Sequence, residues 1–241
     1  MKLDVLAIGA HPDDIELTCG GTLIKLGKQG RRVGIVDLTA GELGTRGSPE
    51  TRAREAAEAA RILGAAVREN LGIDDGNIEN TPDNRRKLIR VIRKYRPDVL
   101  LIPYPVDRHP DHEHAHVLCK ESSFYAGLQR IETEADGTLQ RPFRPRAHYH
   151  YMHWFEFVPS FIVDISNEYE KRMDAVHAFR SQFHDPESKE PSTILSTPDF
   201  MESVRTRLEY YGDKIGRAYG EPFFSTAPLS VNDLWSLNTL P

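Results

Sequence analysis

A histidine and two neighbouring aspartates follow the first apolar segment of the chain. Residues 3–9 are succeeded by the sequence AHPDD, which places His11, Asp13 and Asp14 within four positions. An imidazole and a carboxylate are suitable zinc ligands, and a second carboxylate beside the metal could take a proton from water. Side chains of neighbouring residues diverge in an extended or turning backbone, so the two aspartates can have different roles. AHPDD therefore favours a metal site, and the alternative is an acidic turn that caps a helix.

Four of the ten histidines lie within eight residues of a second segment. This segment, DRHPDHEHAH, covers residues 107–116. Pro110 suits the first turn of a helix, so that His112 and His116 would share one face and His109 would precede the helix. In one interpretation His112 completes a metal site with the first segment. His109 then lies near the metal, where, in the hydrolysis of an amide, it could stabilise an oxyanion or protonate the amine that leaves.

The same segment also contains the metalloprotease sequence HExxH. His112 and His116 would then be zinc ligands one turn apart, with Glu113 as the base. We favour the first interpretation because it combines the loops after two strands and gives His11 a role. HExxH also lacks an evident third ligand downstream. His114 and His116 are then solvated or packed along the helix.

Both histidine segments follow runs of branched apolar residues that predict buried strands. Such runs occur at 3–9, 32–38 and 98–103, and helical patterns at 49–64 and 82–96 lie between them. Alternation at this spacing predicts an α/β fold with a Rossmann-like, mostly parallel sheet flanked by helices. Ligands of such sheets bind beyond the carboxyl ends of the strands, which is where the histidines lie.

The length of 241 residues favours one domain over residues 1–241. We expect a Rossmann-like catalytic half over 1–128 and a less regular α/β half over 129–241 that completes the substrate pocket. The second half has several distinct segments: a polar loop at 132–146, an aromatic-rich stretch at 147–157, a strand at 161–165, helices near 167–183 and 198–217, and a tail, 221–241, that is extended or joins a partner subunit.

Composition argues for a protein that acts on a small molecule. The net charge of −5 and the absence of a basic stripe argue against a nucleic-acid partner. Two cysteines are too few for a disulfide framework, and the N-terminus lacks the layout of a signal peptide. No apolar run approaches the roughly 20 residues that cross a bilayer. We therefore expect a cytoplasmic protein with no membrane contact.

AHPDD after the first strand, together with HPDH after a later one, resembles the LmbE-like, PIG-L-type family of zinc-dependent N-acetylglucosaminyl deacetylases. The resemblance covers nearly the whole chain, through the sequences DLTAGELGTRG, ETRAREAA, NLG, VDIS, SQF and YGEPF. Within the family, the chain looks most like the deacetylase of bacillithiol biosynthesis, which acts on N-acetylglucosaminyl-malate. It departs from that group in Tyr219-Gly220-Glu221, where Tyr-Ala-Glu is more frequent.

The resemblance implies an amidohydrolase that releases acetate and a free amino sugar. One zinc ion per chain would be bound by His11, Asp14 and His112, and iron(II) could replace it. Asp13 would be the general base and His109 its electrostatic or acid partner. The small-molecule partner would be an N-acetylated amino sugar, either N-acetylglucosaminyl-malate or another N-acetylglucosaminide such as chitobiose, and the protein would be a homo-oligomer.

The resemblance also implies substrate contacts by Arg52 and Asp75, with Asp74 an equally near candidate for the second position. Arg46 could share an anionic group of the substrate with Arg52, although an exposed arginine is the simpler interpretation. Around the metal, Asp111 or a neighbouring aspartate, Asp107, would hold the charge of the loop histidine.

Overall fold

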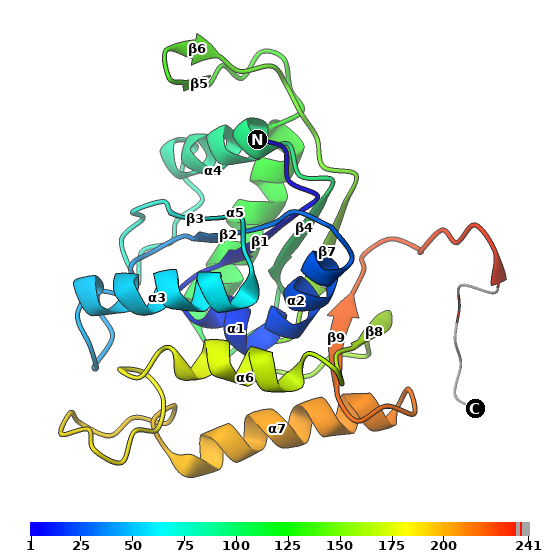
Figure 1. Cartoon of the computed structure of the whole chain (residues 1–241). Helices are drawn as coiled ribbons and strands as arrows, with labels where there is room; N and C mark the ends of the chain where they lie inside the picture. The colour runs from blue at the N-terminus through cyan, green and yellow to red at the C-terminus, as the bar shows by residue number, and fades with distance from the viewer. Residues whose placement is uncertain (235–236, 238–241) are drawn as a thin grey trace.

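Strands and helices alternate along most of the chain (Figure 1), of which the computed structural model describes residues 1–234 and 237. In chain order the elements are β1 (Val5–Gly9), α1 (Asp14–Thr18), α2 (Gly20–Lys28), β2 (Val33–Asp37), α3 (Pro49–Leu63), β3 (Val67–Asn70), α4 (Pro82–Tyr95), β4 (Val99–Pro103), α5 (Pro110–Tyr125), β5 (Glu134–Ala135), β6 (Thr138–Leu139), β7 (Ala147–Tyr151), β8 (Phe161–Asp164), α6 (Tyr169–His177), α7 (Pro198–Asp213) and β9 (Gly220–Phe224). None of the helices in these residues combines the length and the apolar character needed to cross a membrane.

A seven-stranded sheet in the order β3-β2-β1-β4-β7-β9-β8 forms the centre of the molecule. Strands β3, β2, β1, β4 and β7 are parallel, and β9 runs antiparallel to both of its neighbours. The α/β prediction is confirmed. The direction of the strand order reverses between β1 and β4, and this is the position where Rossmann-like sheets bind ligands. Both predicted halves contribute strands to the sheet.

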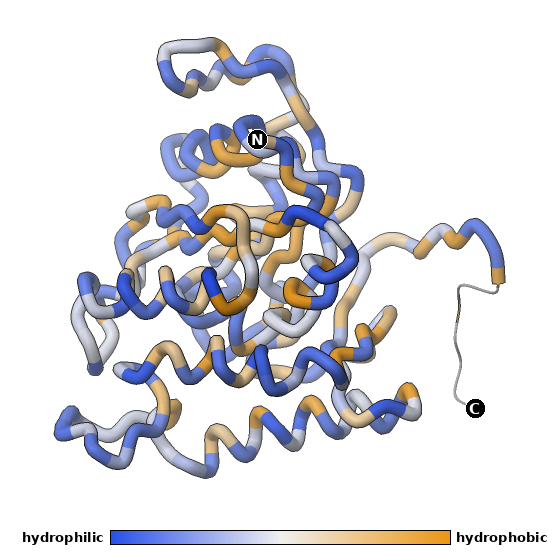
Figure 2. Tube along the Cα trace, viewed as in Figure 1, coloured by the Kyte–Doolittle hydropathy of each residue, from blue (hydrophilic) through white to orange (hydrophobic). Residues whose placement is uncertain are grey.

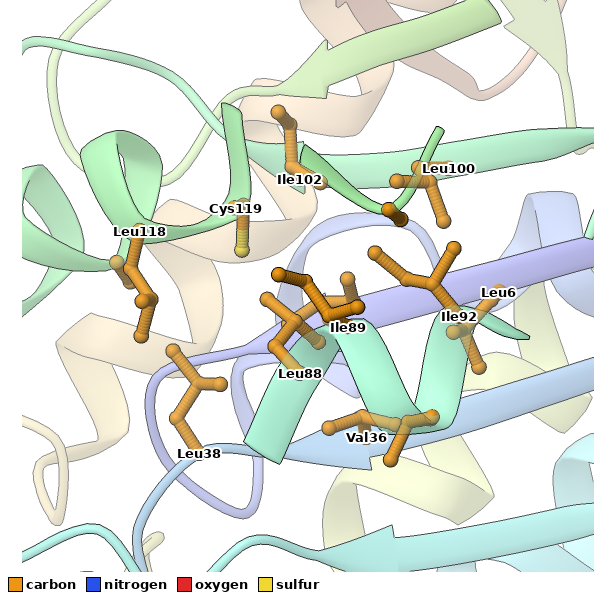
Figure 3. Packing of buried hydrophobic residues seen from close by; sticks show 14 of the residues in the cluster. Leu6, Val36, Leu38, Leu88, Ile89, Ile92, Leu100, Ile102, Leu118 and Cys119 are labelled. Atoms are coloured by element: carbon orange, nitrogen blue, oxygen red, sulfur yellow. The ribbon is translucent and has the colours of Figure 1, made fainter. Parts of the chain in front are cut away.

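Helices cover both faces of the sheet. Leu6 and Ile8 of β1 pack with α4 and α5, whereas Val5 and Ala7 pack with α1 and α2 on the other face. Figure 3 shows the first cluster, where Ile92 and its neighbours in α4 lie over the strands. In Figure 2 the apolar segments concentrate in the central strands. Each fully buried leucine or isoleucine contributes about 1.5–3 kcal/mol, so the two clusters fix the strand ends that carry the site.

The predicted helix signals are confirmed in α3 and α4. Ser48 Oγ accepts a hydrogen bond from the Thr51 amide at the start of α3, and Gly64 ends the helix with φ 73°. Arg96, with φ 48°, ends α4 immediately before Pro97. These local signals give boundaries within one residue of those predicted.

Several elements differ from the sequence-based prediction. β3 was not predicted because its sequence, VREN, is that of a polar, half-exposed edge strand. β7 was predicted only as aromatic-rich, since AHYHY lacks a run of aliphatic residues. The polar loop 132–146 contains the β5–β6 hairpin, which turns at Asp136 and Gly137 with positive φ.

The later helices are shorter than predicted, and the tail begins with a strand. α6 ends at His177 rather than near 183, and α7 ends at Asp213 rather than 217. Residues 220–224 form β9, and 225–233 continue without a helix or strand. The contact of the tail with a partner subunit stays a prediction, and residues 235–236 and 238–241 lie outside the described residues.

The glycine that departs from the bacillithiol-type pattern has a structural reason. A Cβ on Gly220 would lie 2.6 Å from Cγ2 of Ile162 and 3.0 Å from the amide nitrogen of Gly212. Alanine at this position would require α7 to move away from β9.

A buried carboxylate next to this glycine joins three elements. Glu221 of β9 is fully buried and accepts hydrogen bonds from the amides of Gly21 and Thr22 at the start of α2, at 2.9 and 2.7 Å. Its Oε1 also lies 3.0 Å from Nε of Arg172 in α6, which is fully buried as well. The positive end of the helix dipole and the guanidinium together stabilise the carboxylate.

Glu221→Ala should lower the free energy of unfolding by about 3–5 kcal/mol, because it leaves Arg172 as an unpaired buried charge. Urea unfolding followed by circular dichroism measures the change. Glu202→Ala removes the exposed ion pair with Arg205 and serves as the control, which should keep the wild-type midpoint. Equal midpoints for the two variants would contradict this role of Glu221.

Candidate metal centre and active site

The carboxyl ends of β1 and β4 open into a cavity of about 300 Å³. Its lining includes the residues predicted from the two histidine segments. It also includes side chains from the loops after β2, β3 and β7, from α3 and from the segment after α6: His11, Asp13, Asp14, Arg46, Arg52, Asp75, Asp107, Arg108, His109, His112, His153, Trp154 and Gln182. The structure therefore brings together every predicted catalytic, metal-binding and substrate-binding residue. Asp111 lies immediately behind this lining.

His11 is held between carboxylates on both sides of its ring. Nε2 lies 3.0 Å from Oδ1 of Asp75 and 3.3 Å from Oδ2 of Asp111, while Nδ1 faces Oδ2 of Asp14 at 3.8 Å. Burial lowers the pKa of His11, but the hydrogen bonds to Asp111 and Asp75 outweigh it and raise the pKa to about 10. The carboxylates thus create a strong preference for positive charge at this imidazole.

His112 is arranged in the same way. Its Nδ1–H donates to Oδ1 of Asp107 at 2.8 Å, and its Nε2 lies 3.3 Å from Oδ1 of Asp14. Burial lowers its pKa, but the charge of Asp14 and the bond to Asp107 raise it to about 9. Asp14, which both imidazoles face, is buried, and the charge of His112 holds its pKa well below the usual range although burial opposes this.

These residues fit a divalent metal ion. Each imidazole directs one nitrogen at Asp14 and binds a carboxylate through the other, which is the usual support of metal-ligating histidines. The ligand atoms of His11, Asp14 and His112 all lie within 4.8 Å of one another. Two nitrogens, one carboxylate and an open position towards the cavity match a catalytic zinc site. The assignment of these three residues as ligands stays a prediction.

Two other groups in the described residues also bring three ligand atoms within the same distance. They share members with the predicted set: His11, His109 and Asp111 form one, and Asp107, His112 and His153 the other. Asp107 accepts backbone amides at both of its oxygens. Asp111 and Asp14 each accept one amide at Oδ2, and Oδ1 of Asp14 faces the imidazoles of His112 and His153. The contacts of Asp107 therefore argue against the group that contains it.

Asp13 occupies an unusual backbone conformation beside this cluster. Its φ of 121° is in a region that residues other than glycine rarely adopt, and strain of this kind is typical of functional positions. Nη2 of Arg52 lies 3.1 Å from Oδ2 of Asp13, and Arg52 also donates to the carbonyls of Pro12 and Gly41. Burial raises the pKa of Asp13 to about 7 although the charge of Arg52 opposes the shift. A carboxylate of this pKa suits a general base.

Both residues predicted to contact the substrate, Arg52 and Asp75, line the cavity. Arg52 is buried and directed at Asp13, so it reaches the cavity beside the predicted base. Asp75, rather than the exposed Asp74, lines the cavity, where it binds His11 and accepts from the Leu43 amide. Their contacts with a sugar stay predictions.

Arg46 is not the exposed arginine that was expected. It is buried, donates to the Ser181 carbonyl at 2.7 Å and lies 3.7 Å from Oε2 of Glu190. The sequence interpretation was wrong because the loop 185–196 folds over this side chain, a contact that no local pattern predicts.

In the described part of the chain, no hydrogen bond joins the ring of His109 to the carboxylate of Asp111 or Asp107, so the predicted support of its charge by one of them stays a prediction. Nδ1 of His109 accepts from the Asp111 amide at 3.2 Å, and the carboxylate of Asp107 accepts from the His109 amide. The carboxylate of Asp111 binds His11 instead. Since Nδ1 is an acceptor, the neutral ring carries its proton on Nε2, on the side away from that bond.

The residues needed for HExxH do not meet at the site. His116 is buried on α5 with Nδ1 bonded to the Pro103 carbonyl at 3.0 Å, and its ring faces His150. Glu113 accepts from the Asp107 amide. Neither His116 nor Glu113 lines the cavity, which argues against a protease.

Sequence reasoning missed His153 and Trp154, and it missed the role of Asp107. Nε2 of His153 lies 3.1 Å from Oδ1 of Asp14, and the Trp154 amide donates to Oδ2 of Asp107. The HW dipeptide after an apolar–aromatic stretch was the available signal. To use this signal, one would have had to predict that β7 is the parallel neighbour of β4, so that the residues after both strands meet at one edge.

A Rossmann-like sheet with imidazoles and carboxylates at its switch point is typical of metal-dependent hydrolases. Comparison with known proteins agrees. The sequence profile of the PIG-L family, described as GlcNAc-PI de-N-acetylase, matches residues 6–123. The diacetylchitobiose deacetylase of Thermococcus kodakarensis is 32% identical over 228 residues, which cover 90% of this chain and 80% of that protein.

Solved structures extend the similarity to the whole fold. A conserved protein of Thermus thermophilus is 40% identical with a TM-score of 0.85, over 95% of this chain and 97% of that one. The N,N′-diacetylchitobiose deacetylase of Pyrococcus horikoshii, solved with an inhibitor, is 30% identical with a TM-score of 0.75, over 91% and 82% of the two chains. The chain belongs to the PIG-L family of de-N-acetylases, and it is an amidohydrolase.

The two adjacent aspartates should differ in their effect on metal binding. Asp14→Ala should abolish stoichiometric zinc binding because it removes a ligand, whereas Asp13→Asn should retain it. Zinc content after reconstitution and dialysis, measured by plasma mass spectrometry, gives the comparison. Normal zinc content in Asp14→Ala would mean that the two carboxylate roles are exchanged or wrong.

Proposed function

We propose that this protein is a zinc-dependent deacetylase of N-acetylglucosaminyl-malate, in bacillithiol biosynthesis. Membership of the PIG-L family and the relatives named as deacetylases of acetylated amino sugars support the reaction class. The sequence resemblance to the bacillithiol-type group supports the malate substrate. The homo-oligomer and the cytoplasmic location stay predictions.

The choice between the candidate substrates rests on one arginine of the cavity lining. Three arginines line the cavity, but Arg46 and Arg52 are paired with Glu190 and Asp13. Arg108 is exposed, and its guanidinium lies 4.0 Å from the centroid of the Trp154 ring.

In the part of the chain that the structure describes, no carboxylate pairs with Arg108. A guanidinium oriented by an aromatic ring suits a carboxylate. A malate group would supply that partner, whereas the second sugar of diacetylchitobiose has no charge. Diacetylchitobiose is the alternative substrate, favoured by the relative at 32% identity.

The reaction needs a base for the attacking water, and the surroundings of Asp13 support this role. Its carboxylate lies beside Asp14 in the cavity lining, with Oδ2 held by Arg52. Zinc, when bound, lowers the pKa of water and polarises the amide carbonyl. Asp13 accepts the proton of the attacking water and keeps it available for the leaving amine.

His109 would stabilise the oxyanion as a neutral hydrogen-bond donor. Burial lowers the pKa of His109 and so favours the neutral ring, and the charges of His11 and His112 act in the same direction when no metal is bound. The Asp111 amide donates to Nδ1 of the ring, so the proton on Nε2 can be donated to the developing oxyanion. Asp13 is then the simpler proton source for the amine.

Arg108→Gln should lower kcat/KM for N-acetylglucosaminyl-malate by about 10–100-fold, the value of one charge-assisted hydrogen bond of about 1.5–3 kcal/mol. Activity on diacetylchitobiose should be unchanged, because that substrate has no anion. Acetate release from both substrates by the zinc-loaded wild type and the variant makes the comparison. Equal wild-type rates on the two substrates, or equal losses in the variant, would refute the malate assignment.

His109→Ala should lower kcat by about 100–1000-fold, the usual cost of one oxyanion donor, while zinc content stays at one per chain. Single-turnover acetate release and metal analysis of the same preparation measure the two effects. Parallel loss of zinc and activity would instead make His109 part of the metal site.

A further inference from the structure

The segment that follows β7 brings a further histidine to the site from the second half of the chain. The side chain of His153 lines the cavity and is 15% exposed. Its position is fixed from two sides. The His153 carbonyl accepts a hydrogen bond from Arg207 of α7, and the next amide, that of Trp154, donates to Oδ2 of Asp107 at 2.9 Å. A side chain anchored in this way is well suited to orient a neighbour.

That neighbour is Asp14, whose two oxygens have different surroundings. Oδ2 accepts from the His11 amide at 2.9 Å. Oδ1 lies 3.1 Å from Nε2 of His153 and 3.3 Å from Nε2 of His112, whose rings are 4.1 Å apart. His112 is a predicted ligand and is supported by Asp107 through its other nitrogen. His153 has no role in the mechanism described above.

We propose that His153 is a positioning residue of the metal centre, whose Nε2–H donates to Oδ1 of Asp14 and fixes the carboxylate in the orientation that binds a divalent cation. The inference rests on the proposed function, in that Asp14 must be a metal ligand. With Oδ2 held by the His11 amide and Oδ1 held by His153, the carboxylate cannot rotate away from the ligand nitrogens.

Direct ligation by His153 agrees less well with the contacts. The group that would include it needs Asp107 as its carboxylate. Asp107 already accepts from Nδ1 of His112 and from the amides of His109 and Trp154. A carboxylate offers about four acceptor sites, so little of Asp107 is left for a metal ion.

The experiment compares His153→Ala with His153→Gln. Glutamine can place an amide N–H near the position of Nε2 but is not a zinc ligand, so it should keep the bond to Asp14. His153→Ala should weaken zinc binding by about 10–100-fold, as is usual when a group behind a metal ligand is removed. His153→Gln should restore the dissociation constant to near the wild-type value. Competition with a chromophoric chelator measures both constants.

Cobalt(II) substitution adds a readout that a general loss of stability would not change. In His153→Gln the visible cobalt spectrum should keep the wild-type band positions, because the set of ligands is the same. His148→Ala is the matched control, since His148 is a half-buried histidine of the preceding strand that does not line the cavity. Thermal unfolding of the metal-free forms shows that each variant is folded.

Wild-type zinc affinity in His153→Ala would overturn the inference. Equal weakening in both variants with a shifted cobalt spectrum in His153→Gln would also overturn it, because His153 would then be a ligand. Metal affinity does not depend on the sugar, so a wrong substrate leaves this result unaffected. Failure of the wild-type chain to bind zinc would overturn the proposed metal centre and the inference together.

Discussion

The carboxylate of Asp107 is the interaction on which the geometry of the site depends. It accepts hydrogen bonds from Nδ1 of His112, the His109 amide and the Trp154 amide. Through these three bonds one buried side chain fixes a predicted ligand, the start of α5 and the start of the segment after β7. Buried charges are stable only when they are paired and fully hydrogen-bonded, so these elements must keep their relative positions. The same requirement applies to Asp14, Asp75 and Asp111 around His11.

The fold supplies these carboxylates and imidazoles at one place because parallel strands end at a common edge. β1 and β4 are neighbours at the switch point, and each is followed by a loop that carries a histidine and aspartates. β7, which is parallel to β4, and α7 bring the second half of the chain to the same edge, where Arg207 of α7 holds the carbonyl of His153. The second half of the chain therefore does more than line the cavity, because its His153 contacts Asp14, a predicted metal ligand.

The sequence predicted what local patterns determine. Apolar runs, caps and glycine stops predicted the strands β1, β2 and β4 and the helices α3 and α4. The position of the strand ends predicted the two ligand loops. The sequence did not predict contacts that depend on pairing of distant segments, such as Arg52 with Asp13 or Arg46 under the loop 185–196. β7 was not predicted as a strand because its aromatic and histidine residues do not form an aliphatic run. For the same reason His153, which follows β7, was not predicted to lie at the site. Whether His112 or His116 faces the site depends on how α5 packs on the sheet.

Anomalous diffraction at the zinc edge from crystals of the zinc-loaded protein tests the central claim most directly. The account predicts one anomalous peak per chain, about 2.0–2.2 Å from Nδ1 of His11, a carboxylate oxygen of Asp14 and Nε2 of His112, with an open position facing the cavity. A peak bound by Asp107 and His153 instead, or no peak in the cavity, would contradict the account.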